Sequence, residues 1–222
     1  MVGVASNQLA SVVYPSSDGK PVAETFAHLY ALLVTLEILK QYLAGQRATV
    51  LANQFLYYAQ GFPRLRVAPD VMVIFNVESG GRDSYKIWQE GEVPSVIFEM
   101  TSQSTKSQDT EFKRVLYAQM GVQEYWLFDP KGEWLDVQLQ GYCLQGEGYE
   151  AIAHSCSSVL QLRLQAEAEL IGFYRLDTGE KLLPPAELAT ARQQAEARAA
   201  EAEAQVARLQ EKLRSLGIDL DE

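Results

Sequence analysis

Two acidic residues and one lysine are the side chains of this sequence whose types and spacing could carry out chemistry. Glu99 lies within an apolar run, residues 95–101, whose alternation places it on the same face as Ile97. A buried carboxylate without compensation costs several kcal/mol, so Glu99 needs a cation, a proton or a metal ion. Asp70 begins an earlier strand-like run, and Lys113 lies on the helix predicted after Glu99.

Carboxylates on two neighbouring strands, with a lysine close by, suit the metal-assisted hydrolysis of a phosphodiester bond. Asp70 and Glu99 can hold a hard divalent ion such as Mg²⁺ or Mn²⁺ and leave positions open for a phosphate oxygen and a water molecule. Lys113 can then orient that water or add positive charge in the transition state. The competing interpretation is that the two acids form salt bridges or cap helices and that Lys113 is solvated.

A helix with an apolar face is predicted over residues 23–44, with Gly45 as its stop. Glu24 and His28 are four residues apart and share a side of its first turn. One interpretation is that Glu24 compensates the helix dipole and that His28 is an ordinary residue at the surface or the edge of the core. The apolar residues at helical spacing, which we expect to face the core, are Phe26, Leu29, Tyr30, Leu33, Leu36 and Leu43.

The remaining elements predict an α/β fold in which helices flank a mixed sheet. We expect strands over residues 48–58, 66–77 and 95–101, then a helix over residues 106–120 and a strand over residues 124–130. Short, mostly antiparallel strands follow as far as residue 183. The chain therefore contains one globular domain over residues 1–185 and a separate tail over residues 186–222.

The helix predicted over residues 106–120 has two distinct sides. Ser107 or Asp109 is expected to be its N-cap, and Gly121 its stop. Lys113 and Tyr117 are one turn apart and share one side. Lys113 therefore matters for chemistry only if packing brings it over Glu99. The apolar side consists of Phe112, Val115, Leu116 and Met120.

The tail over residues 186–222 has the pattern of a helical, coiled-coil-like segment. Its apolar residues alternate at spacings of four and three, with Arg192 as the interruption. This seam favours either a homodimer formed partly through the tail or a single solvated helix. The seam residues are Leu188, Ala195, Ala199, Ala202, Val206, Leu209, Leu213 and Leu216.

The net charge and the hydrophobicity of the chain limit its possible contacts with DNA and with membranes. The net charge of −10 argues against broad contact with DNA, because phosphate binding depends on Lys and Arg. Any DNA contact would need a local basic patch, a metal bridge or a partner subunit. The sequence has no long apolar run and no signal-peptide pattern, so we expect a cytoplasmic protein without membrane contact.

One block of motifs resembles a known family. The block consists of Ala-Pro-Asp70, Val-Ile-Phe-Glu99-Met-Thr-Ser, the segment from Asp109 to Lys113, and Glu-Tyr-Trp followed by Asp129-Pro130. It resembles the Uma family of restriction-endonuclease-like domains in the PD-(D/E)XK nuclease superfamily. The resemblance covers about residues 21–185 and implies a restriction-endonuclease-like fold.

The resemblance also implies roles for individual residues. Asp70 and Glu99 match the two acids of the superfamily pattern, and Glu24 corresponds to an extra acid on the first helix. With His28 beside Glu24, that helix could cap the metal site. The pattern's lysine should stand where this chain has Thr101, so Lys113 would have to supply the ammonium group. In the Glu-x-x-Ser turn the serine is Ser102, while Gln103 replaces the usual proline. Tyr117 is a further accessory candidate.

Two functions follow from these residues. The first is a Mg²⁺-dependent DNA endonuclease in which Asp70 and Glu99 hold the metal and Lys113 assists the water. The second is a catalytically silent nuclease-like fold that binds nucleic acid or assembles with proteins through its tail. Thr101 at the lysine position and the acidic charge favour the second function, whereas Asp70, Glu99 and Lys113 favour the first.

Overall fold

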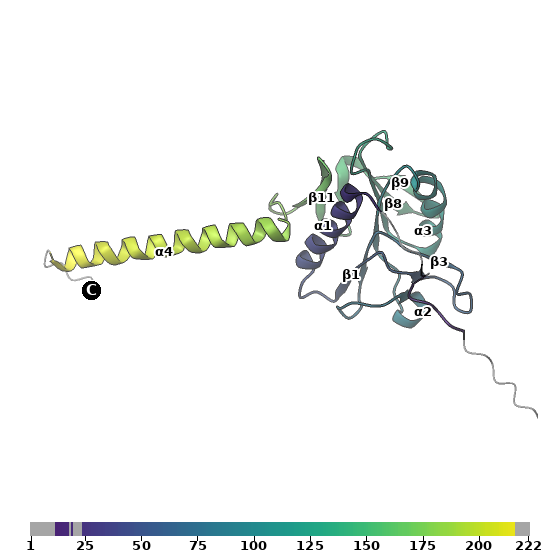
Figure 1. The fold of residues 1–222 in the computed structure, drawn as a ribbon, viewed down its shortest axis with the longest axis horizontal. Helices are drawn as coiled ribbons and strands as arrows, with labels where there is room; N and C mark the ends of the chain where they lie inside the picture. The colour runs from purple at the N-terminus through teal and green to yellow at the C-terminus, as the bar shows by residue number, and fades with distance from the viewer. Residues whose placement is uncertain (1–11, 18, 20–23, 216–222) are drawn as a thin grey trace, which may run out of the picture. The chain divides into compact units, whose positions relative to one another are not determined.

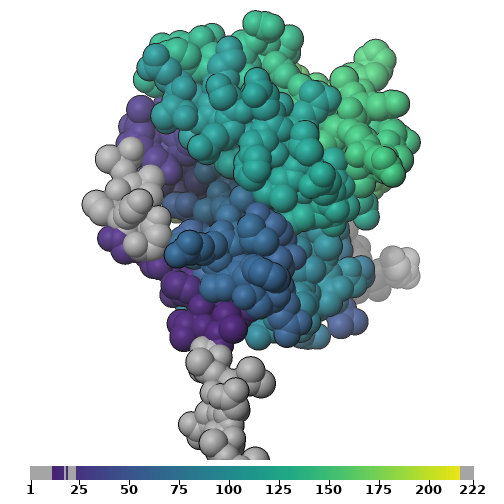
Figure 2. Space-filling view, turned by 90° about the vertical axis from the view of Figure 1, so that its right-hand side faces the viewer, coloured from purple at the N-terminus to yellow at the C-terminus, as the bar shows by residue number. Residues whose placement is uncertain are grey.

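The computed structural model describes residues 12–17, 19 and 24–215. Contacts divide the chain into two units, Met1–Leu182 and Leu183–Glu222. The first unit is a sheet with α1 (Phe26–Tyr42) on one side and α3 (Arg114–Met120) on the other (Figure 1). On the face drawn in Figure 2, purple N-terminal residues lie on the left beside the blue central segment, and the teal later segment lies above the blue one.

The central sheet has six strands in the order β1-β4-β6-β7-β8-β9. Strands β6 and β7 are parallel, and all the other neighbours are antiparallel, so the sheet is mixed as the sequence predicted. The strands are β1 (Ala48–Ala52), β4 (Val71–Phe75), β6 (Val96–Met100), β7 (Glu124–Phe128), β8 (Leu139–Gln145) and β9 (Gly148–Ala151).

Two smaller sheets and two short helices complete the described part of this unit. One sheet pairs β2 (Leu56–Tyr57) with β3 (Arg66–Val67) and β5 (Tyr85–Lys86). The other pairs β11 (Leu162–Glu167) with β10 (Cys156–Ser157) and β12 (Leu170–Arg175). The short helices are α2 (Ile87–Glu90) and η2 (Ala153–Ser155).

The alternation of β6 divides its side chains between two cores. Phe98 packs in the core on the side of α1 (Phe26–Tyr42), together with Leu32 and Leu39 of that helix. Ile97 packs in the opposite core, which contains Tyr117 of α3 (Arg114–Met120). Glu99 shares the face of Ile97, so its carboxylate lies under the helix that carries Tyr117.

Helix α1 begins later than the sequence predicted. Thr25 is its N-cap, and the Thr25 hydroxyl accepts a bond from the backbone N–H of His28. Thr is a favourable N-cap residue, so the helix starts after it. Glu24 therefore precedes the cap instead of lying in the first turn, and Ala23 lies outside the described residues.

The prediction of which side of α1 faces the core was wrong for four residues. Phe26 is 74% exposed, and Leu29, Tyr30 and Leu33 are each more than 40% exposed. The side that packs on the sheet contains small residues such as Ala27 and Ala31. This helix is apolar on nearly all sides. Helical spacing alone therefore did not identify the face whose small residues let the helix pack closely on the sheet.

The helix predicted over residues 106–120 contains a π-helical segment, η1 (Gln108–Lys113), which continues into α3. Gly121 ends α3 in the left-handed conformation, as predicted. Phe112 and Val115 were expected to be buried but are 59% and 58% exposed. A π-helix has i→i+5 bonding, so the 3.6-residue period used for that prediction does not hold across η1.

The second unit consists of α4 (Pro185–Ser215), none of whose described residues is buried. Val206 and Leu209 on the predicted seam are 53% and 57% exposed, and Leu216 lies outside the described residues. None of the helices in the described part of the chain combines the length and hydrophobicity needed to cross a bilayer.

We predict that Gly141→Ala destabilises the first unit. Gly141 lies opposite Trp126 in the β7–β8 pair, and a Cβ atom at residue 141 would lie 2.4 Å from the Trp126 ring. Overpacking of this kind costs roughly 1–3 kcal/mol, measurable as a lower midpoint of urea unfolding. Gly148→Ala on β9 is the control, because its Cβ would meet no atom within 4 Å. Equal midpoints for the two variants would contradict this packing.

Candidate active site

Asp70 lies immediately before β4, at the end of the sheet where β6 finishes. The β4–β6 register pairs Val71 with Phe98, so one further step places Asp70 opposite Glu99. The Oδ2 atom of Asp70 accepts a 2.6 Å bond from the backbone N–H of Met100. This bond fixes the Asp70 carboxylate at the strand end, between the two groups of side chains described next.

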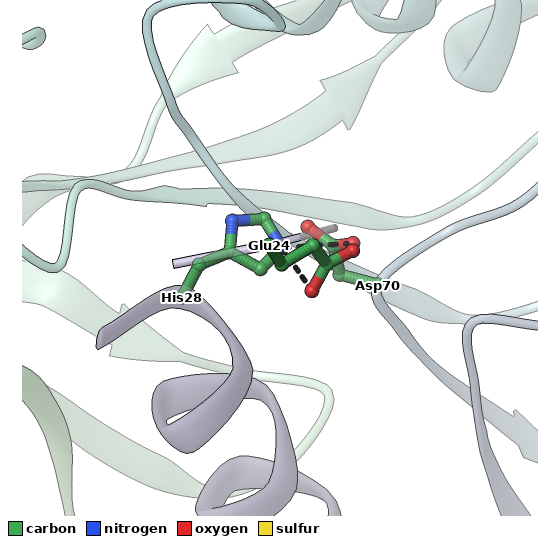
Figure 3. Close-up of side chains that lie close together, drawn as sticks. All are labelled: Glu24, His28 and Asp70. Carbon is green, nitrogen blue, oxygen red and sulfur yellow. Dashed lines mark ion pairs between the residues drawn. The ribbon is translucent and has the colours of Figure 1, made fainter. Parts of the chain in front are cut away.

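The first group consists of Glu24, His28 and Asp70, whose potential ligand atoms all lie within 4.8 Å of one another (Figure 3). The Nε2 atom of His28 is 3.3 Å from Oε2 of Glu24 and 3.6 Å from Oδ1 of Asp70. Their side chains are between 10% and 20% exposed. Two carboxylates and an imidazole this close together form a cluster that could hold a divalent metal ion.

The charges of this cluster affect the protonation of His28. Burial alone would lower the pKa of His28, but the neighbouring carboxylates of Asp70 and Glu24 outweigh burial and raise it above the ordinary value. A protonated imidazole between two carboxylates is thus favourable in the metal-free protein. A metal ligand must be deprotonated, so metal binding here would compete with that proton.

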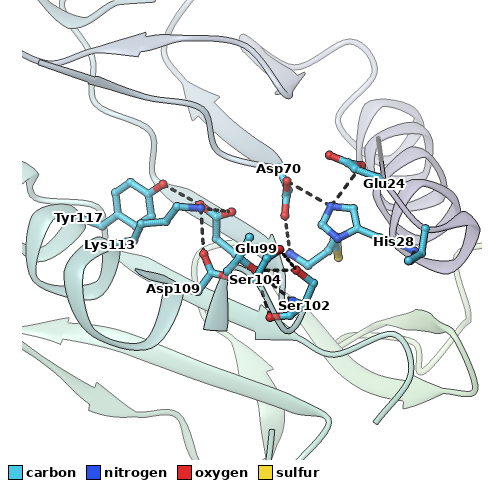
Figure 4. Close-up of polar contacts among 12 residues, drawn as sticks. Glu24, His28, Asp70, Glu99, Ser102, Ser104, Asp109, Lys113 and Tyr117 are labelled. Carbon is cyan, nitrogen blue, oxygen red and sulfur yellow. Dashed lines mark hydrogen bonds and ion pairs between the residues drawn. The ribbon is translucent and has the colours of Figure 1, made fainter. Parts of the chain in front are cut away.

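The second group surrounds Lys113. Its Nζ atom lies 2.8 Å from Oε2 of Glu99 and 2.9 Å from Oδ1 of Asp109. The hydroxyl of Tyr117 donates a 2.7 Å bond to Oε1 of Glu99. Both carboxylates are about 1% exposed. Figure 4 shows the Lys113 group on one side of Asp70 and His28 with Glu24 on the other.

This second group contains more negative than positive charge. Burial raises the pKa of Glu99 to about 8, an effect that the adjacent Lys113 ammonium only partly offsets. Burial likewise raises the pKa of Asp109. For Lys113, burial acts to lower the pKa, but Glu99 and Asp109 raise it above the ordinary value. One ammonium cannot neutralise two buried carboxylates, so the lysine stays charged and the acids compete for a proton.

The structure brings several predicted site residues together. Packing brings Lys113 to Glu99, so this lysine is placed where it could take part in chemistry. Tyr117 contacts the same carboxylate. Glu24 and His28 meet Asp70. Glu99 is not part of that cluster, and its two oxygens bond Tyr117 and Lys113 instead.

Thr101 and Ser102 lie at the end of β6, next to a cleft. Thr101 is 2% exposed, and its side-chain oxygen has no hydrogen-bond partner in the described part of the chain. The Ser102 hydroxyl lies 3.1 Å from that of Ser104. Both residues line a cleft of about 590 Å³ that Glu24 and His28 also line.

Sequence reasoning missed Asp109 as a member of the site. It was considered as an N-cap, but it is buried beside Lys113, and neither it nor Ser107 caps the helix through its side chain. The spacing of four residues between Asp109 and Lys113 was the available signal. The sequence did not reveal that a π-helical segment turns both residues inward.

A mixed sheet with an acidic cluster at a strand end and a lysine that is only 14% exposed beside it fits a restriction-endonuclease-like protein. The chain belongs to the Uma2 family, whose model is described as "Putative restriction endonuclease" and matches residues 9–168. The family resemblance inferred from the motifs is thus confirmed.

One solved structure is similar in part. It is described as a "putative nuclease belonging to DUF820" from Anabaena variabilis ATCC 29413, with 18% sequence identity and a TM-score of 0.45. The similarity covers 73% of this chain and 81% of that chain. The comparison with curated proteins gives no match.

We predict that Glu99 makes stability fall as pH rises. Its pKa is about 8 in the fold, against an ordinary value of 4.5, so between these pH values the folded protein binds more protons than the unfolded chain. The free energy of unfolding should therefore decrease by more than about 1 kcal/mol from pH 5 to pH 9, measured by urea titration.

Glu99→Gln should flatten this pH dependence, leaving the smaller slope of the same sign that His28 and Asp109, whose pKa values are also raised, contribute. Glu150→Gln, at an exposed position on β9, is the control and should keep the wild-type slope. A Glu99→Gln protein with the full wild-type slope would contradict the assignment.

Proposed function

We propose that this protein is a metal-dependent endonuclease that hydrolyses DNA phosphodiester bonds. The observation that carries the proposal is the buried Lys113–Glu99 ion pair beside the Glu24–His28–Asp70 cluster. Lys113 supplies the ammonium that the superfamily pattern would place at Thr101. The site thereby has the acids and the cation that phosphodiester hydrolysis needs.

The donor atoms of the cluster fit a divalent cation. Carboxylate oxygens suit Mg²⁺ and Mn²⁺, and the imidazole of His28 makes Mn²⁺ the better match of the two. A bound ion would lower the pKa of the attacking water and stabilise charge on the phosphate. Glu99 is proposed as a further ligand, since a carboxylate has about four lone-pair sites and Tyr117 and Lys113 occupy two of them.

The residues around Lys113 have separate roles in this proposal. Asp109 and Glu99 hold the Lys113 Nζ atom at a fixed position, and that ammonium orients the water and offsets charge on the phosphate. Tyr117 fixes the rotamer of Glu99 through its hydroxyl. Glu99, whose pKa is about 8 in the metal-free protein, would have to lose its proton to join the cluster as a ligand.

The function predicts metal binding that depends on Asp70. Titration calorimetry with Mn²⁺ should give saturable binding to the wild type and none to Asp70→Ala, because Asp70 is central to the cluster. Glu24→Gln, His28→Ala and Glu99→Ala should each weaken binding about tenfold or more. With Mn²⁺ or Mg²⁺ present, Lys113→Met should slow the nicking of supercoiled DNA by roughly 100-fold or more.

Two exposed positions provide matched controls. Asp83→Ala removes an exposed aspartate outside the cluster and should leave Mn²⁺ binding unchanged. Lys106→Met removes an exposed lysine near the start of the same helical segment and should leave nicking unchanged. Wild-type binding by Asp70→Ala, or wild-type nicking by Lys113→Met, would rule out the proposed mechanism.

An assembly function through the tail is the second proposal. Helix α4 has no buried residue in the described part of the chain, and its seam exposes Val206 and Leu209. Apolar residues at heptad spacing are buried when two such helices pair. We propose that the tail forms a homodimer, which would serve either a nuclease that cuts both strands or a catalytically silent nuclease-like module.

The double substitution Val206→Glu and Leu209→Glu is predicted to abolish this dimer. Light scattering coupled to size-exclusion chromatography, over a range of protein concentrations, should give a dimer mass for the wild type and a monomer mass for the variant. Gln205→Glu with Gln210→Glu adds the same charge next to the seam and should stay dimeric. A monomeric wild type would exclude the tail as a dimer interface.

A further inference from the structure

The cleft beside the Glu24–His28–Asp70 cluster has two walls that the proposed chemistry does not use. Residues 101–105 form one wall, and residues 129–131 with Trp134 form the other, while Glu24 and His28 line the side nearest the cluster. The cleft volume of about 590 Å³ lies in the range of small-ligand pockets, roughly 300–1,000 Å³. It can therefore hold a nucleotide-sized segment.

The wall formed by residues 101–105 is rich in hydroxyl groups. Thr101 is 2% exposed and its Oγ1 atom has no hydrogen-bond partner among the described residues. Ser102 Oγ lies 3.1 Å from Ser104 Oγ and 3.2 Å from Thr105 Oγ1. A buried hydroxyl without a partner costs free energy, so a ligand oxygen that bonds it is favoured.

The opposite wall is held rigid by Asp129, which is fully buried. Its Oδ1 atom accepts bonds from the backbone N–H groups of Lys131 and Gly132, at 3.1 and 3.0 Å. Its Oδ2 atom accepts bonds from those of Trp134 and Leu135. The backbone that carries Lys131 and Trp134 is therefore ordered before a ligand binds, which lowers the entropy cost of binding.

Trp134 has a free aromatic surface. It is partly exposed, and no ring in the described part of the chain stacks on it, whereas Trp126 stacks on Phe98 and Trp88 contacts Tyr14. Lys131 is the single lysine or arginine among the described residues that line the cleft. Affinity for a polyanion would therefore come mainly from stacking and hydrogen bonds, which fits the net charge of −10.

We propose that this cleft binds one unpaired nucleic-acid strand, with a phosphate against the hydroxyls of residues 101–105 and Lys131 and with a base stacked on Trp134. The proposal rests on the nuclease function proposed above and specifies that the strand is unpaired where the cleft holds it, as in a single strand, a strand end or a locally melted segment of supercoiled DNA. A base presents its flat face to Trp134 only when it is unpaired and unstacked from its neighbour.

The test measures binding of a labelled single-stranded DNA oligonucleotide and of the matching duplex to the full chain by fluorescence anisotropy. Titrations are made at low salt with EDTA and again with Ca²⁺. The wild type should bind the single strand more tightly than the duplex. Trp134→Ala should weaken single-strand binding roughly tenfold or more, and Trp134→Phe should retain most of it, since stacking on an aromatic ring contributes on this scale.

Tryptophan fluorescence supplies a second readout. Binding of the unlabelled strand should quench the emission, and the quench should be lost in Trp134→Phe but kept in Trp88→Phe, whose ring lies outside the cleft. The unfolding midpoint of Trp134→Ala, measured in urea, establishes that the variant is folded.

Three results would overturn the proposal: no single-strand binding by the wild type in either buffer, unchanged affinity in folded Trp134→Ala, or equal or tighter binding of the duplex. None of these readouts requires cleavage or Mn²⁺. Failure of this inference is therefore distinguishable from failure of the nuclease function, which the metal and nicking measurements decide.

Discussion

One buried ammonium between two buried carboxylates is the constraint on which the site depends. Glu99 and Asp109 are both about 1% exposed, and Lys113 provides their shared cation. Removing the lysine would leave two uncompensated charges in the core, whereas a proton on one acid leaves a balanced pair. The alternation of β6, the inward turn of η1 and the hydroxyl of Tyr117 all act to keep this arrangement.

Asp70 lies between the buried group around Lys113 and the more exposed side chains of Glu24 and His28 at the strand end. Its backbone-bonded carboxylate lies opposite Glu99 across the β4–β6 pair and within 3.6 Å of His28. The buried part of the site, around Glu99, is preorganised by bonds between side chains. The part that contains Glu24 and His28 borders a cleft. Such a division lets a rigid set of charges act on a ligand that enters from solvent.

The sequence predicted the family, the mixed sheet, the face of β6 that carries Glu99 and the shared side of Lys113 and Tyr117, because strand alternation and i,i+4 spacing are local properties. It left open whether packing would bring Lys113 over Glu99. It mispredicted the exposed residues of α1, because that helix is apolar on nearly all sides. It also missed the buried position of Asp109, because η1 departs from the α-helical period on which the prediction relied. The meeting of Glu24 and His28 with Asp70 depends on how α1 docks on the sheet, which no local pattern specifies.

The two halves of the site also differ in how far apart their residues lie along the chain. Glu99, Asp109, Lys113 and Tyr117 belong to one strand–helix unit, so little loop-closure entropy opposes their meeting. Glu24 and His28 reach Asp70 only when α1 docks on a sheet built from distant strands. We expect the ion pairs of Lys113 with Glu99 and Asp109 to form early in folding. The Glu24–His28–Asp70 cluster should form late. A partly folded chain would then hold its lysine in place without yet presenting a site for an ion.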